Sequence, residues 1–265
     1  MIEIKNLNKY YGETAAVRDL SLKLKNGVVY GVLGAAGAGK STLLSLLSGS
    51  VAPSSGEIRI NGFDLGQQPK KARECLGYLP ANTPLYPSLS PVEHLRFCAE
   101  ARGISYERSL RLIQQAMELV GLLDVKDRPA SLLSMAERRR LSLSMAIVGG
   151  GEILLLDDPM IALSPSERAE ILEILRMLAP KRTLFLAGED ATELGGLCQH
   201  LLFLSEGRLV ADVDADDPEA NTHLAALSEE RARKRTEAAS RDRDTVPLRD
   251  GEYEIIDTET GREER

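Results

Sequence analysis

The chain has 265 residues, 43% hydrophobic and only 4% aromatic with no tryptophan, so it can bury a large and mainly aliphatic core. Its net charge of −7 lies in residues 212–265, which hold 17 acids and 9 bases, whereas residues 1–211 hold 23 acids and 24 bases. This neutral body has no basic stripe, which argues against nucleic acid as a main partner.

The sequence also lacks the features typical of membrane-spanning proteins, secreted proteins, and proteins with a zinc or redox centre. No apolar run approaches the roughly 18 to 20 residues of a membrane helix, and the N-terminus alternates like a strand, unlike a signal peptide. Three cysteines and three histidines are scattered without CxxC spacing, which disfavours a zinc or redox centre. We therefore expect a cytoplasmic protein with reduced thiols, which needs a partner chain for any role at a membrane.

Two kinds of apolar pattern alternate along residues 1–211. Strand patterns are found at 2–8, 17–25, 27–34, 56–65, 75–80, 153–157, 182–187, 200–207 and 207–213. Helical spacing is found at 39–49, 90–102, 105–120, 134–148 and 165–178. The first two strands predict an antiparallel, half-exposed sheet, and the later strands, which alternate with helices, predict a parallel one. The uninterrupted helical block at about 85–148 is typical of an inserted subdomain.

The composition changes at about residue 212, which we take as a domain boundary. Residues 223–244 are predicted to form a charged surface helix, whereas residues 246–265 have too few apolar side chains to pack alone. We expect this acidic extension, 212–265, to be partly disordered. Two interpretations stay open: a solvated extension without a function, or an arm that binds a partner or regulates the body.

Residues 34–42, GAAGAGKST, match the phosphate-binding pattern G-x-x-x-x-G-K-[ST] and lie between a predicted strand and a predicted helix, as that pattern requires. Glycines let backbone N–H groups turn inward and approach phosphate oxygens, and the following helix presents its positive N-terminus. Lys40 would neutralise the β- and γ-phosphates, and Ser41 would give a hydroxyl to Mg²⁺. The candidate contacts to ATP in this loop are Gly34, Ala35, Gly37, Ala38, Gly39, Lys40, Ser41 and Thr42.

Two adjacent acids, Asp157 and Asp158, follow the apolar run at 153–156 at the end of a predicted strand. In P-loop proteins an aspartate at such a strand end holds Mg²⁺ at the nucleotide, so Asp157 is the predicted metal ligand together with Ser41. Its neighbour Asp158 is the candidate catalytic base. With the loop at 34–42, these acids predict a site for ATP and Mg²⁺.

With both ends of the site identified, residues 1–211 resemble the ATP-binding subunit of an ABC transporter. The order of elements matches that family, and LYPSLSPVEHLRFCAEARG is similar to subunits that pair with ABC-2 type membrane permeases. The resemblance implies an α/β fold, a P-loop NTPase core with an N-terminal antiparallel β subdomain and an inserted α-helical subdomain. It also implies that Tyr11 stacks on adenine with Val17 beside it, and that Ser134 approaches the γ-phosphate across a dimer interface.

Several positions depart from the pattern of that family. The glutamine that reaches Mg²⁺ and the attacking water aligns with Ala81, unless a slip of one residue lets Asn82 substitute. The signature Leu-Ser-Gly-Gly-Gln aligns with Leu133–Glu137, where Met and Ala add Cβ atoms in place of bare backbone. The Gly-Leu-Asp of a later loop reads Ala162–Ser164, which removes a carboxylate.

The two positions nearest to the chemistry are changed as well. The switch histidine aligns with Glu189, and an ionised carboxylate at about 4 Å from another negative charge is repelled by about 4 kcal/mol at an effective dielectric of about 20. Glu189 must therefore be protonated, turned away or bridged by an ion. Asp158 stands where the family has a glutamate, and a shift of about 1 Å in a positioned base can lower the rate about 100-fold.

These residues predict an ATP-binding subunit in which nucleotide closes a dimer and moves a separate membrane permease, with slow or absent hydrolysis. Two alternatives stay open: a fully active transport ATPase, in which Asp158 is the base and Glu189 or Asp190 positions the water, and a pseudo-ATPase that acts as a scaffold or sensor. The partner subunit can be a second copy or a different ATP-binding chain. The resemblance implies a peripheral location on the inner face of the cell membrane, and it leaves the cargo and the direction of transport open.

Overall fold

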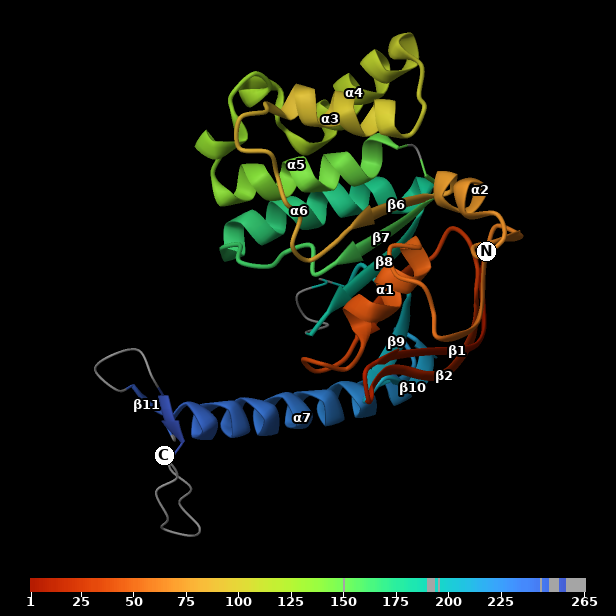
Figure 1. Ribbon diagram of the computed structural model, residues 1–265, viewed down its shortest axis with the longest axis vertical. Coiled ribbons are helices and arrows are strands. Elements are labelled where there is room, and N and C mark those ends of the chain that lie inside the picture. Colours follow the sequence, from red (N-terminus) through yellow and green to blue (C-terminus); the bar gives the residue numbers. More distant parts are fainter. Residues whose placement is uncertain (150, 190–193, 195, 244, 248–252, 256–265) are drawn as a thin grey trace.

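The computed structural model describes residues 1–149, 151–189, 194, 196–243, 245–247 and 253–255. Two β-sheets and a stack of helices make up the body of the molecule (Figure 1). The first sheet is antiparallel, and its strand order is β2 (Thr14–Leu24), β1 (Ile2–Tyr11), β4 (Ser55–Ile60) and β5 (Phe63–Asp64). The antiparallel sheet expected at the start of the chain is confirmed, and β4 and β5 extend it.

The second sheet has six strands. Their order is β10 (Arg208–Asp214), β9 (His200–Ser205), β3 (Val29–Leu33), β8 (Thr183–Gly188), β7 (Ile153–Asp157) and β6 (Leu76–Leu79). The five strands from β9 to β6 are mutually parallel, and β10 pairs with β9 in the antiparallel sense. Strand β7 is buried along its whole length because both faces of the sheet are covered, which explains its continuous apolar run. The predicted parallel sheet is confirmed.

Helix α1 (Lys40–Ser48) fills the space between the two sheets. Its residues Leu44 and Leu47 share one buried cluster with Leu7 of β1, Leu155 of β7 and Phe185 of β8. The helix ends at Gly49, whose φ of 72° is the left-handed conformation that closes helices without strain in glycine. This packing holds the N-terminus of α1 at the carboxyl end of β3, where the phosphate-binding loop lies.

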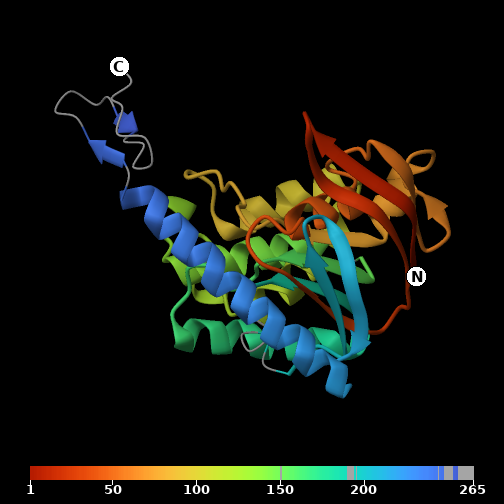
Figure 2. The same cartoon turned by 90° about the horizontal axis from the view of Figure 1, so that it is seen from below.

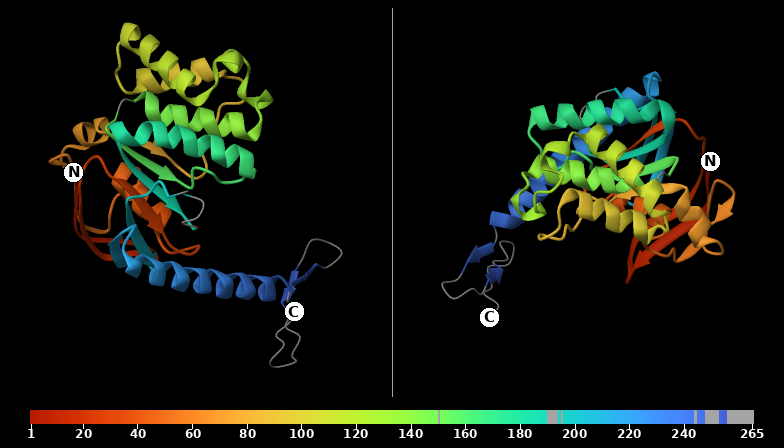
Figure 3. Two further views of the ribbon diagram at one scale, coloured as in Figure 1. Left: turned by 180° about the vertical axis from the view of Figure 1, so that it is seen from behind. Right: turned by 90° about the horizontal axis from the view of Figure 1, so that it is seen from above.

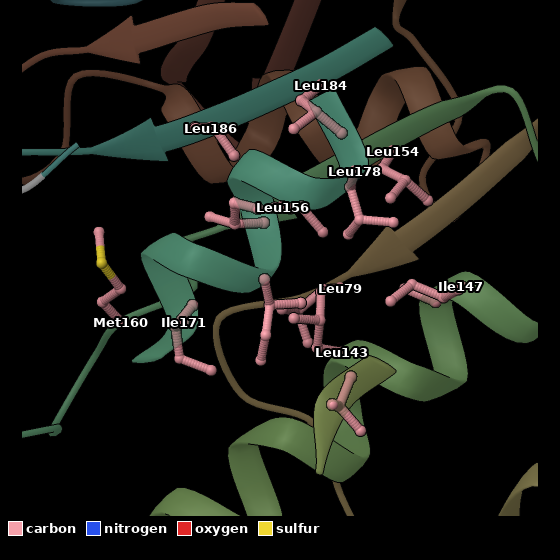
Figure 4. Close-up of a cluster of buried hydrophobic side chains, with 14 of the residues drawn as sticks. Leu79, Leu143, Ile147, Leu154, Leu156, Met160, Ile171, Leu178, Leu184 and Leu186 are labelled. Carbon is pink, nitrogen blue, oxygen red and sulfur yellow. The ribbon is translucent and has the colours of Figure 1, made fainter. Parts of the chain in front are cut away.

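Helices cover the opposite face of the six-stranded sheet (Figures 1 and 3). Helices α5 (Met135–Val148) and α6 (Pro165–Leu178) lie on the sheet, and α3 (Pro91–Ala101) and α4 (Tyr106–Val120) lie beyond α5. Leu154 and Leu156 of β7 meet Leu143 of α5 and Ile171 and Leu178 of α6 in one buried cluster (Figure 4). Helices α3 and α4 stack on α5, and all three follow β6 and precede β7 in the chain. The helical block is therefore inserted in the chain between β6 and β7, which are neighbouring strands of the sheet.

Three of these helices begin with the same local signal. Ser90, Ser134 and Ser164 are the N-caps of α3, α5 and α6, and each serine accepts a hydrogen bond from the backbone N–H of a glutamate three residues later. The glutamate side chain bonds back to the N–H of the cap, so two unpaired donors are satisfied at each helix start. This reciprocal pattern fixes the residue at which each of these helices starts, close to the starts expected from apolar spacing at 90, 134 and 165.

Shorter elements complete the body. Helix α2 (Pro69–Glu74), which the sequence patterns did not predict, precedes β6. The described part of the chain also contains the short 3-10 helices η1 (Leu123–Val125), η2 (Ala130–Leu132) and η3 (Ala179–Lys181). In the described part of the chain, no helix has both the length and the apolar character that crossing a membrane requires.

Helix α7 (Pro218–Arg243) follows β10 and passes below the six-stranded sheet before it extends beyond the body (Figure 2). Ala220 and Leu227 are buried, at 1% and 7% exposure, in the same hydrophobic cluster as Leu154 and Leu156 of β7. Strands β11 (Thr245–Pro247) and β12 (Tyr253–Ile255) pair antiparallel beyond its end. The limits of the domains and the partial disorder expected for 212–265 stay predictions, and several residues of this extension lie outside the described part.

Candidate functional site

The site begins where three parallel strands end side by side. In the register of the sheet Leu33 of β3 pairs with Gly188 of β8, and Asp157 of β7 pairs with Ala187. The loops that follow these strands therefore start at one edge, with Gly34, Asp158 and Glu189 as their first residues. The carboxyl edge of a parallel sheet is the usual place for a ligand in such folds.

The phosphate-binding loop lies close to backbone on two sides. A Cβ added at Gly34 would lie 2.5 Å from the carbonyl oxygen of Leu204, and one added at Gly39 would lie 2.4 Å from that of Ala16. Gly39 also has a φ of 103°, which side chains rarely tolerate. No side chain caps α1 at this end, and the N–H groups of a helix start point toward the position that an anion takes.

Lys40 and Ser41 emerge from the start of α1 toward the loop and toward β7. The Lys40 Nζ donates to the carbonyl oxygens of Gly34 and Ala35 at 2.7 and 3.0 Å. The Ser41 hydroxyl donates to Oδ1 of Asp157 at 3.1 Å. The structure thus brings the predicted phosphate cation and the two predicted Mg²⁺ ligands together.

Asp157 is almost fully buried, at 3% exposure. Burial raises the pKa of its carboxyl group above the ordinary value. Hydrogen bonds from Ser41 and from the backbone of Ala81 lower this pKa, as do the charges on Lys40 and Arg139, but burial has the larger effect. A carboxylate oxygen beside a hydroxyl oxygen is a pair of hard ligands that suits Mg²⁺. The residues present therefore fit Mg²⁺, the metal that the phosphate-binding pattern implies.

Arg139 of α5 lies behind these acids, and sequence reasoning missed it. Its guanidinium, in a residue 6% exposed, donates to the carbonyl oxygens of Pro159 at 2.9 Å, Asp157 at 3.0 Å and Ala81 at 3.1 Å, and also to that of Asp158. Burial lowers the pKa of Arg139, while Asp158 and Asp157 act in the opposite direction. Arg139 therefore joins the helical block to the loops after β6 and β7. Its neighbours in the chain, Arg138 and Arg140, are also arginines, so the sequence alone does not indicate which of the three is buried.

The backbone at Asp158 is unusual, with a φ of 48°. Its N–H donates to the carbonyl oxygen of Ala187 at 3.0 Å, and its carbonyl accepts from Arg139, so its loop is tied to β8 and to α5. Glu189, at the end of β8, forms an ion pair with Arg231 of α7 at 3.9 Å. Asp190 lies outside the described residues.

The remaining predicted residues lie at the start of α5 and on β1 and β2. Ser134 caps α5, where its hydroxyl accepts from the N–H of Glu137 at 3.2 Å. Tyr11 is 50% exposed at the end of β1, and the Nζ of Lys9 lies over its ring at 5.0 Å from the ring centre. Val17 is 1% exposed within the core below the antiparallel sheet, so its side chain does not face solvent. The roles expected of Tyr11, Val17 and Ser134 stay predictions.

The fold and the site together define a P-loop protein with a phosphate-binding helix start and an adjacent strand-end aspartate. The family model described as ABC transporter matches residues 17–161. The chain belongs to the ABC transporter family, as one of its ATP-binding proteins.

Individual relatives agree with this assignment. The linearmycin resistance ATP-binding protein LnrL of Bacillus subtilis (strain 168) is 30% identical over 212 residues, which cover 80% of this chain and 68% of LnrL. The Nod factor export ATP-binding protein I of Cupriavidus metallidurans is 31% identical over 213 residues, which cover 80% and 70%. The dimeric ATP-binding cassette MJ0796, solved in a post-hydrolysis state with ADP and Pi, has a TM-score of 0.74 at 21% identity and covers 82% of this chain and 100% of its own. The predicted fold class and the predicted family are confirmed.

Proposed function

We propose that this chain is the transporter subunit that binds ATP with Mg²⁺, closes as a dimer around the nucleotide and thereby moves a separate permease, while it hydrolyses ATP slowly or not at all. One observation carries the proposal: the two halves of the site differ. For binding, the Lys40 Nζ is held by the carbonyl of Gly34 and the Ser41 hydroxyl donates to Asp157. For hydrolysis, Ala81 and Glu189 align with the glutamine and the switch histidine of the family and lack their side chains.

Binding follows from the geometry around the loop. The N–H groups at the start of α1 would donate to phosphate oxygens, and the Lys40 Nζ would move from the carbonyl of Gly34, 2.7 Å away, onto the phosphates. Ser41 and Asp157 would hold Mg²⁺, which when bound neutralises charge on the β- and γ-oxygens. The resemblance adds Tyr11 as the surface on which adenine stacks and Ser134 of a second subunit as a further contact to phosphate.

Hydrolysis lacks the same support. The N–H of Ala81 bonds to Asp157, so the backbone at this position keeps a structural contact, but a methyl side chain cannot orient a water. Asp158 is a methylene shorter than glutamate, and hydrogen bonds to Ala187 and Arg139 fix its backbone. Its carboxylate therefore cannot recover the missing length by a shift of the loop.

The binding half is tested by Lys40→Ala in calorimetric titrations with ATP and Mg²⁺. We expect the variant to lose measurable affinity, because it removes the cation that faces the phosphates. Lys23→Ala is the matched control, since Lys23 is 68% exposed on β2 and pairs with Glu3. Equal affinity of the Lys40 variant and the unmodified chain would refute the binding site.

The hydrolytic half is tested by turnover of the full chain with its permease. A rate of order 1 to 10 per second, which is within the ordinary range of enzymes, would establish the fully active alternative and exclude slow hydrolysis. Asp158→Glu restores the missing methylene, so it should raise turnover if the length of the base limits the reaction. An unchanged rate in this variant would mean that Ala81 and Glu189, and not the length of the base, limit turnover.

The permease would dock beside the helical block. A cleft of about 1110 Å³ lies there, between α2 and β6 on one side and the junction of α3 and α4 on the other. Four of its lining residues are basic, against two acidic ones: Lys70, Arg73, Arg102 and Arg108 against Glu74 and Glu100. A permease loop with acidic side chains or the negative C-terminus of a short helix fits this charge. Arg73→Glu with Arg108→Glu should release the chain from membranes that contain the permease, and retention would refute this docking site.

A further inference from the structure

Helix α7 is anchored to the body by its first half. Ala220 and Leu227 are buried at 1% and 7% exposure in the same cluster as Phe203 of β9, and the His223 ring lies 5.2 Å from the Phe203 ring between centroids. These contacts are spaced along one face of the helix. The helix therefore has a fixed position against the edge of the sheet where β9 and β10 lie.

Arg231 continues the anchored face toward the nucleotide site. It follows Leu227 by four residues, so it lies one turn further on the same face. Its side chain is 20% exposed, and its Nε lies 3.9 Å from Oε2 of Glu189, whose side chain is 41% exposed. The acidic extension of the chain thus places the guanidinium of Arg231 beside Glu189, the residue at the switch position.

Glu189 itself lies beside the phosphate loop. It follows Gly188, which pairs with Leu33 in the parallel register, so it begins its loop next to Gly34. A carboxylate at this place repels the terminal phosphate of ATP, and it repels ADP less because ADP lacks that phosphate. An arginine on the other side of the carboxylate lowers this repulsion.

We propose that Arg231 is a specificity-determining residue, which neutralises Glu189 so that the site accepts the γ-phosphate, and that docking of α7 in this way favours ATP over ADP. The inference rests on the proposed function, because it concerns the same nucleotide site. It assigns the extension after residue 212 a regulatory role: undocking of α7 would expose the Glu189 charge and weaken ATP selectively.

The test compares the affinities for ATP and ADP in the full chain by calorimetric titration. Arg231→Ala should weaken ATP binding about fivefold, since an ion pair of this exposure contributes up to about 1 kcal/mol, and should weaken ADP binding clearly less. Arg231→Lys retains the charge and should keep most of the preference for ATP. Arg233→Ala is the matched control, because a residue two positions along faces another side of the helix.

A double variant tests whether Arg231 acts through Glu189. In a Glu189→Gln background there is no carboxylate to neutralise, so the further change Arg231→Ala should have no effect on the ratio of the two affinities. An unchanged ATP affinity in Arg231→Ala, or an equal loss for ATP and ADP, would overturn the inference. If the unmodified chain bound neither nucleotide, the proposed function itself would fail, so the two failures are distinguishable.

Discussion

Replacement of Arg139 by methionine is the sharpest test of how the helical block is held to the site. The side chain is 6% exposed and donates to backbone carbonyls on both sides of it, among them Ala81 at 3.1 Å, Asp157 at 3.0 Å and Pro159 at 2.9 Å. Methionine has a similar length and no donor. Arg139→Met therefore removes these bonds at once without leaving a large cavity.

The magnitude follows from the contacts. A buried carbonyl that loses its donor costs about 1–3 kcal/mol, so the bonds to Ala81, Asp157 and Pro159 together set an upper limit of several kcal/mol. Part of this loss is offset because the guanidinium, whose pKa is lowered by burial, no longer has to be desolvated. We expect the free energy of unfolding to fall by about 3 kcal/mol.

Urea denaturation followed by circular dichroism measures this loss, provided that the slope of the transition is unchanged. Arg138→Met is the matched control: its guanidinium donates to the carbonyls of Leu133 and Ser131 at 3.0 and 2.9 Å, within the same segment and nearer to solvent. We expect that control to lose less than about 1 kcal/mol. Equal losses in the two variants would refute the idea that Arg139 ties two parts of the protein together.

Three further predictions concern other parts of the structure. Gly39→Val should abolish ATP binding and lower stability by about 1–3 kcal/mol, because its Cβ would lie 2.4 Å from a carbonyl of β2; calorimetry and denaturation measure the two effects. Burial lowers the pKa of His200, but hydrogen bonds to Asp212 and Asp214 outweigh it, so the pKa rises above 6.5. His200→Gln should therefore destabilise the protein at pH 6 and hardly at pH 9, since the stabilisation present below the unfolded pKa is lost as pH rises through the folded one. Burial raises the pKa of Cys198 to about 12, so alkylation at pH 8 should label this thiol only after unfolding.

Much of the fold was predictable because its signals are local. Continuous apolar runs marked the buried strands, and helical spacing of apolar residues marked α3, α5 and α6, whose starts also carry a serine followed three residues later by a glutamate. The phosphate loop was predictable for the same reason, since its glycines, Lys40 and Ser41 are contiguous. Helix α2 was missed because its six residues, Pro69–Glu74, are too few to display a helical period.

The parts of the site that the sequence did not predict depend on contacts between distant segments. Arg139 meets carbonyls up to 59 residues away, and nothing in its own neighbourhood distinguishes it from Arg138 or Arg140. Arg231 lies in a segment whose composition indicated only a charged surface helix, and its partner Glu189 is 42 residues earlier. Spacing predicts faces of helices, but it does not predict which other element a face will meet.

The two halves of the site differ in what each requires of a residue. Phosphate binding depends mainly on backbone: the N–H groups at the start of α1 and glycines that admit close approach, with Gly39 at a φ of 103°. Attack by water depends on side chains of the right length and charge. At Ala81 the N–H still bonds to Asp157, so the loop has kept its structural contact while its side chain has no means to orient a water. The same distinction applies at Asp158, whose backbone is held and whose carboxylate is short. We therefore expect such a site to retain ATP affinity well after its turnover has declined.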